Sequence, residues 1–115
     1  MIIGIGVDIC QVDRVAAMLE RHPGLMDRLF NSAESHTADG RPRSADSLAA
    51  RFCAKEALAR APGSPGGMSW LDAEVITSAN GAPEFVIRGT VAARAAECAV
   101  QNIRLSLSHD GGLAT

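Results

Sequence analysis

Asp8 is the first residue of the chain whose position suggests chemistry. It follows an apolar run, residues 2–9, that could form a strand. Because side chains alternate across a strand, Gly4, Gly6 and Asp8 would then lie on one face, with Asp8 at its end. Glycines on that face let a ligand or another backbone approach closely. A carboxylate there predicts a Mg²⁺ ligand, since this ion is usually held by one or two carboxylates and substrate phosphates. The alternative is that Asp8 only caps the following helix.

A second acidic residue lies in the strongest predicted helix. Phe52, Glu56 and Arg60 recur at intervals of four, so they are expected along one helix face. If this face meets Asp8, the two carboxylates form a Mg²⁺ site. Arg60 and Lys55 would then receive phosphate oxygens, as phosphoryl-type transfer requires. The alternative is that Glu56 and Arg60 form a solvated ion pair without a role in chemistry.

The first predicted helix carries a basic face. Arg14, Met18 and Arg21 lie apart from its apolar positions, and Arg28 follows further along the chain. A basic stripe around an exposed methionine suits an acidic protein partner, and the alternative is an ordinary solvated face. On its own, His109 at the end of a predicted strand indicates only a surface or capping residue.

The elements that must position these residues begin with a buried strand predicted over residues 2–9. The polar stretch 36–47 lacks periodicity and is expected to form a mobile loop. Helical spacing predicts three helices, at about 13–21, at about 25–35, and a long helix that Ser44 or Asp46 caps and that ends near Ala61.

A β-hairpin is predicted in the second half of the chain, because Asn80-Gly81 separates β-like segments at about 70–78 and 83–88. The order of the elements predicts a single α+β domain over residues 1–115, with a mainly antiparallel sheet packed with the long helix. Two further elements are expected, a helix at about 90–101 and a strand at 103–108.

Composition excludes several classes of protein. With 115 residues, 47% hydrophobic and 21% charged, the chain suits one globular domain with a thin core, neither disordered nor membrane-spanning. A net charge of −2 argues against non-specific nucleic-acid binding. Three cysteines without paired spacing favour free thiols in the cytoplasm, and the N-terminus lacks the pattern of a signal peptide.

Three motifs together resemble one enzyme family. They are Gly4-Ile5-Gly6-Val7-Asp8-Ile9, Arg51-Phe52-Cys53-Ala54-Lys55-Glu56-Ala57 and Ser106-Leu107-Ser108-His109. In this order and spacing they resemble the holo-[acyl-carrier-protein] synthase family of 4′-phosphopantetheinyl transferases. The resemblance implies the 4′-phosphopantetheinyl transferase fold. It also implies Mg²⁺-dependent transfer of the 4′-phosphopantetheine arm of coenzyme A to a serine of apo acyl carrier protein, with release of adenosine 3′,5′-bisphosphate.

The resemblance implies roles for individual residues. Asp8 and Glu56 would be the Mg²⁺ ligands and, with Arg60, the catalytic group. Arg60 stands where family members commonly have Lys, and since Arg stays protonated we expect it to bind the pyrophosphate and carry no proton. The acceptor of the serine proton stays open between Glu56, a metal-bound water and solvent. The residues implied in coenzyme A binding are Arg51, Lys55, Arg60, Gly63, Asn80, Gly81, Ser108 and His109.

Partners and assembly follow from the same resemblance. The family assembles as a homotrimer with each active site at a subunit boundary, and an association of this kind would extend the thin core. In this family the acidic carrier protein docks on a basic helix. The residues of this chain that match that helix are Arg14, Met18, Arg21 and Arg28.

The sequence departs from the family pattern in two places. The family's chain continues into an apolar closing strand where this sequence ends at Thr115, so we expect an unpaired sheet edge. Pro62 is expected to end the long helix early and to shift Gly63 relative to the pyrophosphate. The leading hypothesis is an active cytoplasmic transferase. The alternatives are a non-catalytic module that binds coenzyme A or a carrier protein, inactivated by truncation, and a transferase domain that serves a multienzyme synthase.

Overall fold

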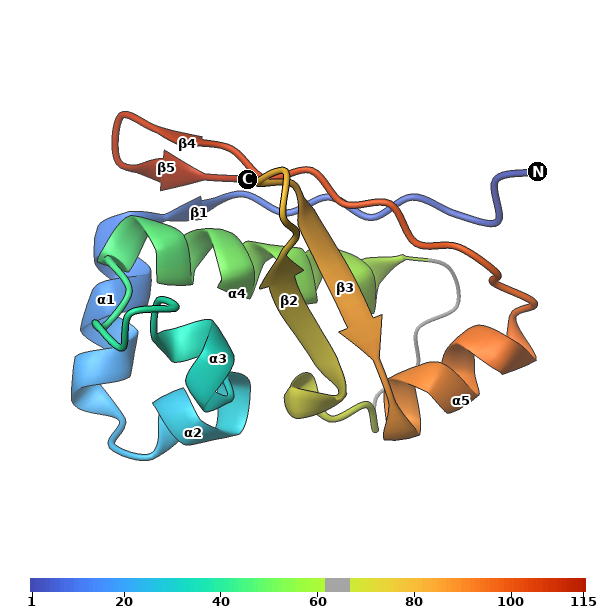
Figure 1. The fold of residues 1–115 in the computed structure, drawn as a ribbon, viewed down its shortest axis with the longest axis horizontal. Coiled ribbons are helices and arrows are strands. Elements are labelled where there is room, and N and C mark those ends of the chain that lie inside the picture. The colour runs from blue at the N-terminus through green and yellow to red at the C-terminus, as the bar shows by residue number, and fades with distance from the viewer. Residues whose placement is uncertain (62–66) are drawn as a thin grey trace.

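One long helix is the central element of the computed structural model, which describes residues 1–61 and 67–115 (Figure 1). Helix α4 spans Ala45–Arg60. The Ser44 side chain accepts a hydrogen bond of 3.2 Å from the Ser47 amide, which satisfies a free donor of the first turn. The predicted cap is therefore confirmed, and the helix ends where the sequence indicated.

Three shorter helices precede α4. The sequence predicted one helix over 25–35, and this prediction is wrong because Asn31 starts a new helix. Its side chain accepts from the Glu34 amide at 2.9 Å, while the Glu34 carboxylate accepts from the Asn31 amide at 3.2 Å. The three helices are α1 (Val12–Arg21), α2 (Leu25–Leu29) and α3 (Ser32–Ser35).

The hairpin predicted around Asn80-Gly81 is confirmed, and its two strands pair antiparallel. A short 3₁₀ helix replaces the first residues of the predicted strand. The helix expected after the hairpin is present but ends at Glu97, before the predicted boundary near residue 101. The four elements are η1 (Trp70–Asp72), β2 (Ala73–Thr77), β3 (Pro83–Ile87) and α5 (Gly89–Glu97).

A second sheet joins the two ends of the chain. Strand β5 (Leu113–Ala114) lies between β1 (Cys10–Gln11) and β4 (His109–Asp110), and both pairings are antiparallel. The strands predicted at 2–9 and 103–108 are absent from the described residues. A strand requires a hydrogen-bonded neighbour, and neither segment is paired along its length. Residues 2–9 instead run extended beside α4 (Figure 1).

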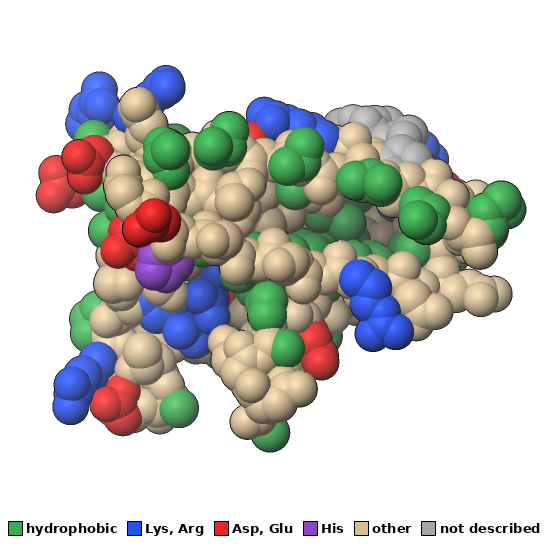
Figure 2. Space-filling model, turned by 90° about the horizontal axis from the view of Figure 1, so that it is seen from above, with side chains coloured by type: hydrophobic (Ala, Val, Ile, Leu, Met, Phe, Trp, Pro, Cys, Tyr) green, Lys and Arg blue, Asp and Glu red, His purple; other side chains and the backbone are tan. Residues whose placement is uncertain are grey.

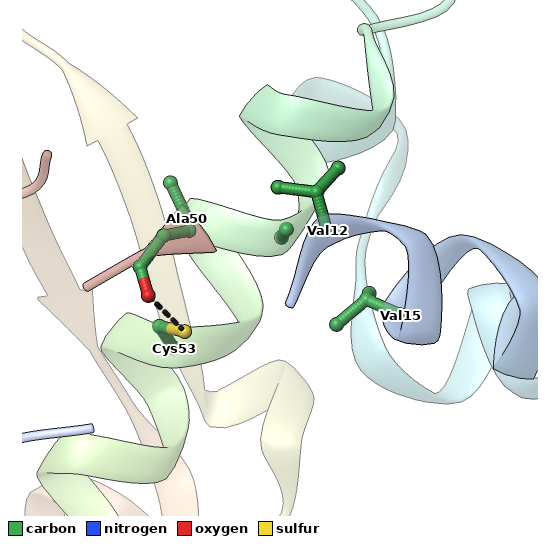
Figure 3. Packing of buried hydrophobic residues seen from close by; sticks show 6 residues of the cluster. Val12, Val15, Ala50 and Cys53 are labelled. Atoms are coloured by element: carbon green, nitrogen blue, oxygen red, sulfur yellow. Dashed lines mark hydrogen bonds between the residues drawn. The ribbon is translucent and has the colours of Figure 1, made fainter. Parts of the chain in front are cut away.

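The core between α1, α4 and β5 is built from small side chains. A hydrogen bond of 3.5 Å from Cys53 Sγ to the Ala114 carbonyl ties β5 to α4 (Figure 3). Because the cluster is rich in alanine, neighbouring segments can lie close to α4. Its buried residues are Val12, Val15, Ala49, Ala50, Cys53 and Ala114.

The α+β class predicted from the element order is confirmed, since all described strand pairs are antiparallel and accompany the long helix. Within the described ranges, no helix has the length and hydrophobicity needed to cross a membrane. Figure 1 shows α4 between the N-terminal segment on one side and α3, η1 and β2 on the other. Side chains on opposite sides of α4 therefore meet different parts of the fold.

Candidate active site

Asp8 reaches helix α4 because the N-terminal segment crosses that helix at a glycine. A Cβ on Gly6 would lie 1.8 Å from the Ala57 carbonyl oxygen and 3.1 Å from the Ala61 nitrogen. Only a residue without Cβ lets the two backbones approach this closely. The close backbone approach predicted for this face is thus present. Asp8, two residues later on the same side, is carried to the C-terminal half of α4.

Arg60 joins the two carboxylates that the sequence singled out. Its Nη1 lies 2.5 Å from Asp8 Oδ1, and its Nη2 lies 3.8 Å from Glu56 Oε2. The Asp8 side chain is 9% exposed and that of Glu56 24%, whereas the Arg60 side chain is 60% exposed. Two carboxylates that are far apart in the sequence therefore face the same cation, close to solvent.

These two carboxylates fit Mg²⁺ as a donor set. Both offer oxygen atoms and both already lie beside one positive charge. Mg²⁺ is commonly held by one or two carboxylates, with substrate phosphates and water completing its coordination. The described residues contain no group of three or more His, Cys, Asp or Glu that could hold a metal. A Mg²⁺ ion at Asp8 and Glu56 would consequently need water or substrate oxygens to complete its coordination.

A cleft of about 650 Å³ opens beside the carboxylates, and helix α1 lines its other side. Three of the four residues predicted as a carrier-protein dock, Arg14, Met18 and Arg21, line this cleft. Arg28, in α2, does not. The predicted row on α4 is confirmed as one face, because its three members all line the cleft: Phe52, Glu56 and Arg60.

Lys55, which the sequence predicted at the phosphates, does not line the cleft and points into the protein. Its side chain is 1% exposed, and its Nζ donates to the Leu29 carbonyl at 2.5 Å, Glu34 Oε1 at 2.8 Å and the Trp70 carbonyl at 3.0 Å. An ammonium group has three protons, so all of them are used inside the protein. Burial lowers the pKa of Lys55, and the hydrogen bond and charge of Glu34 oppose that shift.

Arg51 lies one helical turn before Lys55 and is also buried, at 6% exposure. Its Nη1 donates to Ser47 Oγ at 2.7 Å and its Nη2 to Thr77 Oγ1 at 3.1 Å, while its buried Nε finds no hydrogen-bond partner among the described residues. Burial and then the charge of Arg43 lower the pKa of Arg51. Neither arginine forms an ion pair within the described part of the chain. Although the charge of Glu34 also acts on Arg51, two neighbouring guanidiniums that form no ion pair among the described residues are suited to an anion.

The other residues predicted to bind coenzyme A are spread over the surface. Asn80 and Gly81 form the turn of the β2–β3 hairpin, and Ser108 and His109 are exposed at the start of β4. None of these four lines the cleft beside Asp8. Gly63, also predicted at the pyrophosphate, lies outside the described residues.

Comparison with known proteins identifies the family of this site. Residues 4–113 match the family model described as the 4′-phosphopantetheinyl transferase superfamily. The chain belongs to this superfamily. The family resemblance inferred from three short motifs is therefore confirmed over nearly the whole chain.

Individual superfamily members match the chain closely. A holo-[acyl-carrier-protein] synthase of Streptomyces avermitilis is 54% identical over 114 residues, covering 99% of this chain and 93% of that protein. The crystal structure of the Neisseria meningitidis synthase has a TM-score of 0.86 at 26% identity, covering 99% of this chain and 94% of the other. A Bacillus anthracis synthase in complex with CoA (3′,5′-ADP) has a TM-score of 0.76 at 32% identity, covering 99% and 91%.

The structure of this transferase reveals two further residues near the predicted site residues that the sequence analysis did not single out. Glu34 is the partner of Lys55, and the spacing Asn31-x-x-Glu34 of a capping box was the signal that could have marked it. The charge of Arg43 acts on Arg51, and the Nε of Arg43 is likewise buried without a hydrogen-bond partner in the described ranges. It falls in a polar stretch without periodicity, so no local pattern marked it.

Two thiols lie behind the carboxylates of the transferase site. Cys10 Sγ and Cys53 Sγ are 2.6 Å apart, and Cys53 is buried while Cys10 lines the cleft. All three cysteines are free thiols, as the sequence predicted. Burial raises the pKa of the Cys53 thiol, and the hydrogen bond with Cys10 and the charge of Asp8 raise it further. Cys53 is consequently protonated at neutral pH.

Proposed function

We propose that this transferase moves the 4′-phosphopantetheine arm of coenzyme A onto a serine of apo acyl carrier protein. The observation that carries the proposal is that Asp8, Glu56 and Arg60 line one cleft together with the basic face of α1. Groups for phosphate chemistry and a surface for an acidic protein thus share one opening. The 54% identity to a holo-[acyl-carrier-protein] synthase over 93% of its length favours an enzyme over a non-catalytic binding module.

In the proposed reaction the serine hydroxyl oxygen attacks the phosphorus that bears the pantetheine arm. A bond forms between that oxygen and phosphorus, and the bond from phosphorus to the bridging oxygen of the pyrophosphate breaks. Adenosine 3′,5′-bisphosphate leaves with the electron pair, and the serine proton is lost to a base. The product is holo acyl carrier protein.

The chain's own contribution to this step is charge at the pyrophosphate. Asp8 and Glu56 would hold Mg²⁺, which when bound neutralises charge on the pyrophosphate oxygens. Arg60, 60% exposed and in reach of both carboxylates, is suited to bind the same oxygens. Because a guanidinium stays protonated, Arg60 binds and orients the pyrophosphate and takes no proton.

We assign the adenosine end of coenzyme A to the other side of α4. Arg51 is a buried guanidinium that forms no ion pair with any described residue, and the charge of Arg43 acts on it, so the pair suits the 3′-phosphate. The Bacillus anthracis relative is described in complex with CoA (3′,5′-ADP), a ligand of this class. The surface residues assigned to the same end of coenzyme A are Asn80, Gly81, Ser108 and His109.

The residues assigned to the adenosine end of coenzyme A lie away from the Asp8 cleft, and this separation supports an active site shared between two copies of the chain. Ile5, Val7 and Ile9 are 79%, 72% and 65% exposed, on the side of the N-terminal segment opposite Asp8. Figure 2 shows a row of hydrophobic side chains across the face seen from above. Exposed apolar rows of this kind mark interfaces, and we propose that a homotrimer covers this one. Light scattering tests this: three copies are expected, and a stable monomer would refute it.

For the carrier protein we propose a dock centred on Arg14, Met18 and Arg21. Carrier proteins of this family are acidic, so a local basic stripe on a chain of net charge −2 provides complementary charge. These three side chains line the same cleft as Glu56, which would bring the acceptor serine toward the pyrophosphate. Arg28 does not line the cleft and is proposed as a contact at the edge of the dock.

We propose the cytoplasm as the compartment and fatty acid biosynthesis as the use of the product. Three free thiols support a reducing compartment, because disulfides are rare there. A carrier protein that bears a thiol arm is the form that can hold acyl chains during their synthesis. A transferase serving the carrier domains of a multienzyme synthase would share the chemistry and differ in its partner.

Intact-mass analysis of apo acyl carrier protein tests the proposed activity. The protein is incubated with this chain, coenzyme A and Mg²⁺, and a matched sample contains a chelator. The expected result is a mass gain of one phosphopantetheine that the chelator prevents. No gain from a folded chain that binds coenzyme A would refute the transferase and favour the non-catalytic module.

A further inference from the structure

The Lys55 ammonium group joins three separate parts of the chain to helix α4. Its hydrogen bonds reach the Leu29 carbonyl at the end of α2, the Glu34 carboxylate in α3 and the Trp70 carbonyl in η1, at 2.5, 2.8 and 3.0 Å. The side chain is 1% exposed, so water does not compete for these protons. Lys55 thus fixes the side of α4 that does not line the cleft.

Glu34 completes this network and is fully buried. Its Oε1 accepts from Lys55 Nζ at 2.8 Å and from the Asn31 amide at 3.2 Å, and its Oε2 accepts from the Val75 amide at 2.9 Å. Both carboxylate oxygens are therefore engaged, one by the cap of α3 and by Lys55, the other by strand β2. The hydrogen-bond partners of Glu34 define the direction from which Lys55 must approach.

The helix geometry connects this network to the cleft. Successive residues of an α-helix are rotated by about 100° because there are about 3.6 residues per turn. Lys55 and Ala57 therefore point to nearly opposite sides of α4, and Glu56 points between them. Lys55 is held by the buried network, and Ala57 is held by the close approach of Gly6. Together the two contacts fix the rotation of α4 about its axis and thereby the direction of Glu56.

Stability alone gives little reason for such a network. Replacing a buried ion pair by apolar residues of similar volume is often neutral or stabilising, because desolvation offsets the attraction between the charges. A need to hold α4 in one orientation does explain the network, since the three hydrogen bonds of Lys55 have defined directions and allow the helix little rotation about its axis. The position of Lys55, next to Glu56 in the sequence, makes that orientation relevant to the carboxylate site.

We propose that Lys55 and Glu34 are positioning residues for the transfer reaction, which hold α4 in the rotation that directs Glu56 into the cleft beside Asp8. The inference rests on the proposed function of Glu56 as a metal ligand. Neither residue lines the cleft. They act through Glu56, in the same way that residues hydrogen-bonded to a metal ligand orient that ligand.

The double variant Glu34→Gln with Lys55→Met tests the proposal without leaving a lone buried charge. The change Glu34→Gln removes the charge and keeps one acceptor oxygen, which can serve the amide of Val75 but not that of Asn31 as well, because these amides donate to different oxygens of Glu34. Methionine is a flexible apolar replacement for lysine. Val91→Ala is the matched control, because Val91 is a buried residue of α5 outside the cleft. It removes core packing and leaves the Lys55 contacts in place.

The first readout is direct metal binding, measured from the paramagnetic resonance signal of free Mn²⁺ in the presence of coenzyme A. For the double variant we expect affinity for Mn²⁺ to fall about tenfold or more, as when a partner behind a metal ligand is lost. The Mg²⁺ concentration for half-maximal transfer should rise in parallel. The control, matched in loss of Tm, should keep the wild-type values for both.

A folded double variant with wild-type Mn²⁺ affinity and kcat would overturn the proposal. Glu34→Asp provides a second variant if the double variant does not fold, since it keeps the charge and shortens the reach to Lys55 by one methylene. It should weaken Mn²⁺ binding by a smaller factor, and wild-type affinity would again contradict a positioning role. If the wild-type chain itself neither binds Mn²⁺ nor transfers the arm, the proposed function fails, which is distinguishable from failure of this inference.

Discussion

The backbone of Gly6 passes so close to Ala57 of helix α4 that a methyl group on its Cα would lie 1.8 Å from the Ala57 carbonyl oxygen. This contact brings the N-terminal segment against the backbone of the helix that carries Glu56. It decides where Asp8 lies, because Asp8 follows on the same side of the extended segment. Asp8 then meets Arg60 at 2.5 Å.

Gly6→Ala is therefore expected to lower both stability and activity. The added methyl group must push two backbones apart, which costs about 1–3 kcal/mol in a packed region. Displacement of Asp8 by about 1 Å should lower transfer about a hundredfold. Thermal unfolding and intact-mass assays measure the two effects. Gly4→Ala, at an exposed glycine of the same segment, is the control. Wild-type Tm and rate in Gly6→Ala would contradict the proposed contact.

Asp8→Asn and Glu56→Gln should each lower transfer by about a hundredfold or more, because each removes a charge that would hold the metal at the pyrophosphate. The fold should persist, since Arg60 is largely exposed and its ion pairs contribute little to stability. Initial rates across a Mg²⁺ titration measure the effect. Asp13→Asn, at an exposed carboxylate of α1, should leave the rate unchanged. Full activity in both site variants would refute the metal assignment.

Charge reversal of Arg14 and Arg21 should raise KM for the acyl carrier protein about tenfold or more, because attraction across the dock becomes repulsion. KM for coenzyme A should stay unchanged. In the wild type, KM for the carrier protein should rise with salt, since these side chains face a solvent-filled cleft. Arg104→Glu, at an exposed arginine that does not line the cleft, is the control. A selective loss of coenzyme A binding would show that the dock is misassigned.

Arg51→Gln should remove the preference for coenzyme A over 3′-dephospho-coenzyme A. A hydrogen bond to a charged group contributes about 1.5–3 kcal/mol, so the wild type should prefer coenzyme A about tenfold or more in kcat/KM. The ratio of the two kcat/KM values is the measurement, because it does not depend on the fraction of folded enzyme. A variant that keeps the wild-type preference would place the 3′-phosphate elsewhere.

Cys53 should resist alkylation in the folded protein, and raising the pH from about 7 to 9 should not accelerate it. Its pKa is raised, first by burial, so the reactive thiolate stays unpopulated through this range. Mass spectrometry of peptides after iodoacetamide treatment measures the labelling. Cys98, a partly exposed thiol in the same chain, is the internal comparison. Fast labelling of Cys53 without unfolding would contradict its burial behind Asp8.

Part of this site could be predicted from patterns among residues that are close in the sequence. The alternation of Gly4, Gly6 and Asp8 follows from strand geometry even though no strand forms, because an extended chain has the same period. The row Phe52, Glu56 and Arg60 follows from helix geometry in the same way. Ser44 and the hairpin turn were foreseen for a similar reason, since caps and turns depend on a few neighbouring residues.

The same local rules could not fix the rotation of a helix within the fold. Lys55 is adjacent to Glu56 and was expected at a phosphate, yet its ammonium group is used by Glu34, Leu29 and Trp70. Its partners come from separate segments, so nothing near Lys55 in the sequence marks it as buried. Arg43 was missed for the same reason, because its relation to Arg51 exists only after the loop before α4 has folded back.

The chemical groups of this transferase, the faces on which they lie and the family to which the chain belongs can all be derived from the amino-acid sequence. Which of these faces meet cannot, because that depends on the crossing at Gly6 and on the buried Glu34–Lys55 pair, contacts that form only when distant segments pack together. Residues 2–9 likewise form no strand despite their alternation, since a strand requires a hydrogen-bonding neighbour and periodicity cannot supply one.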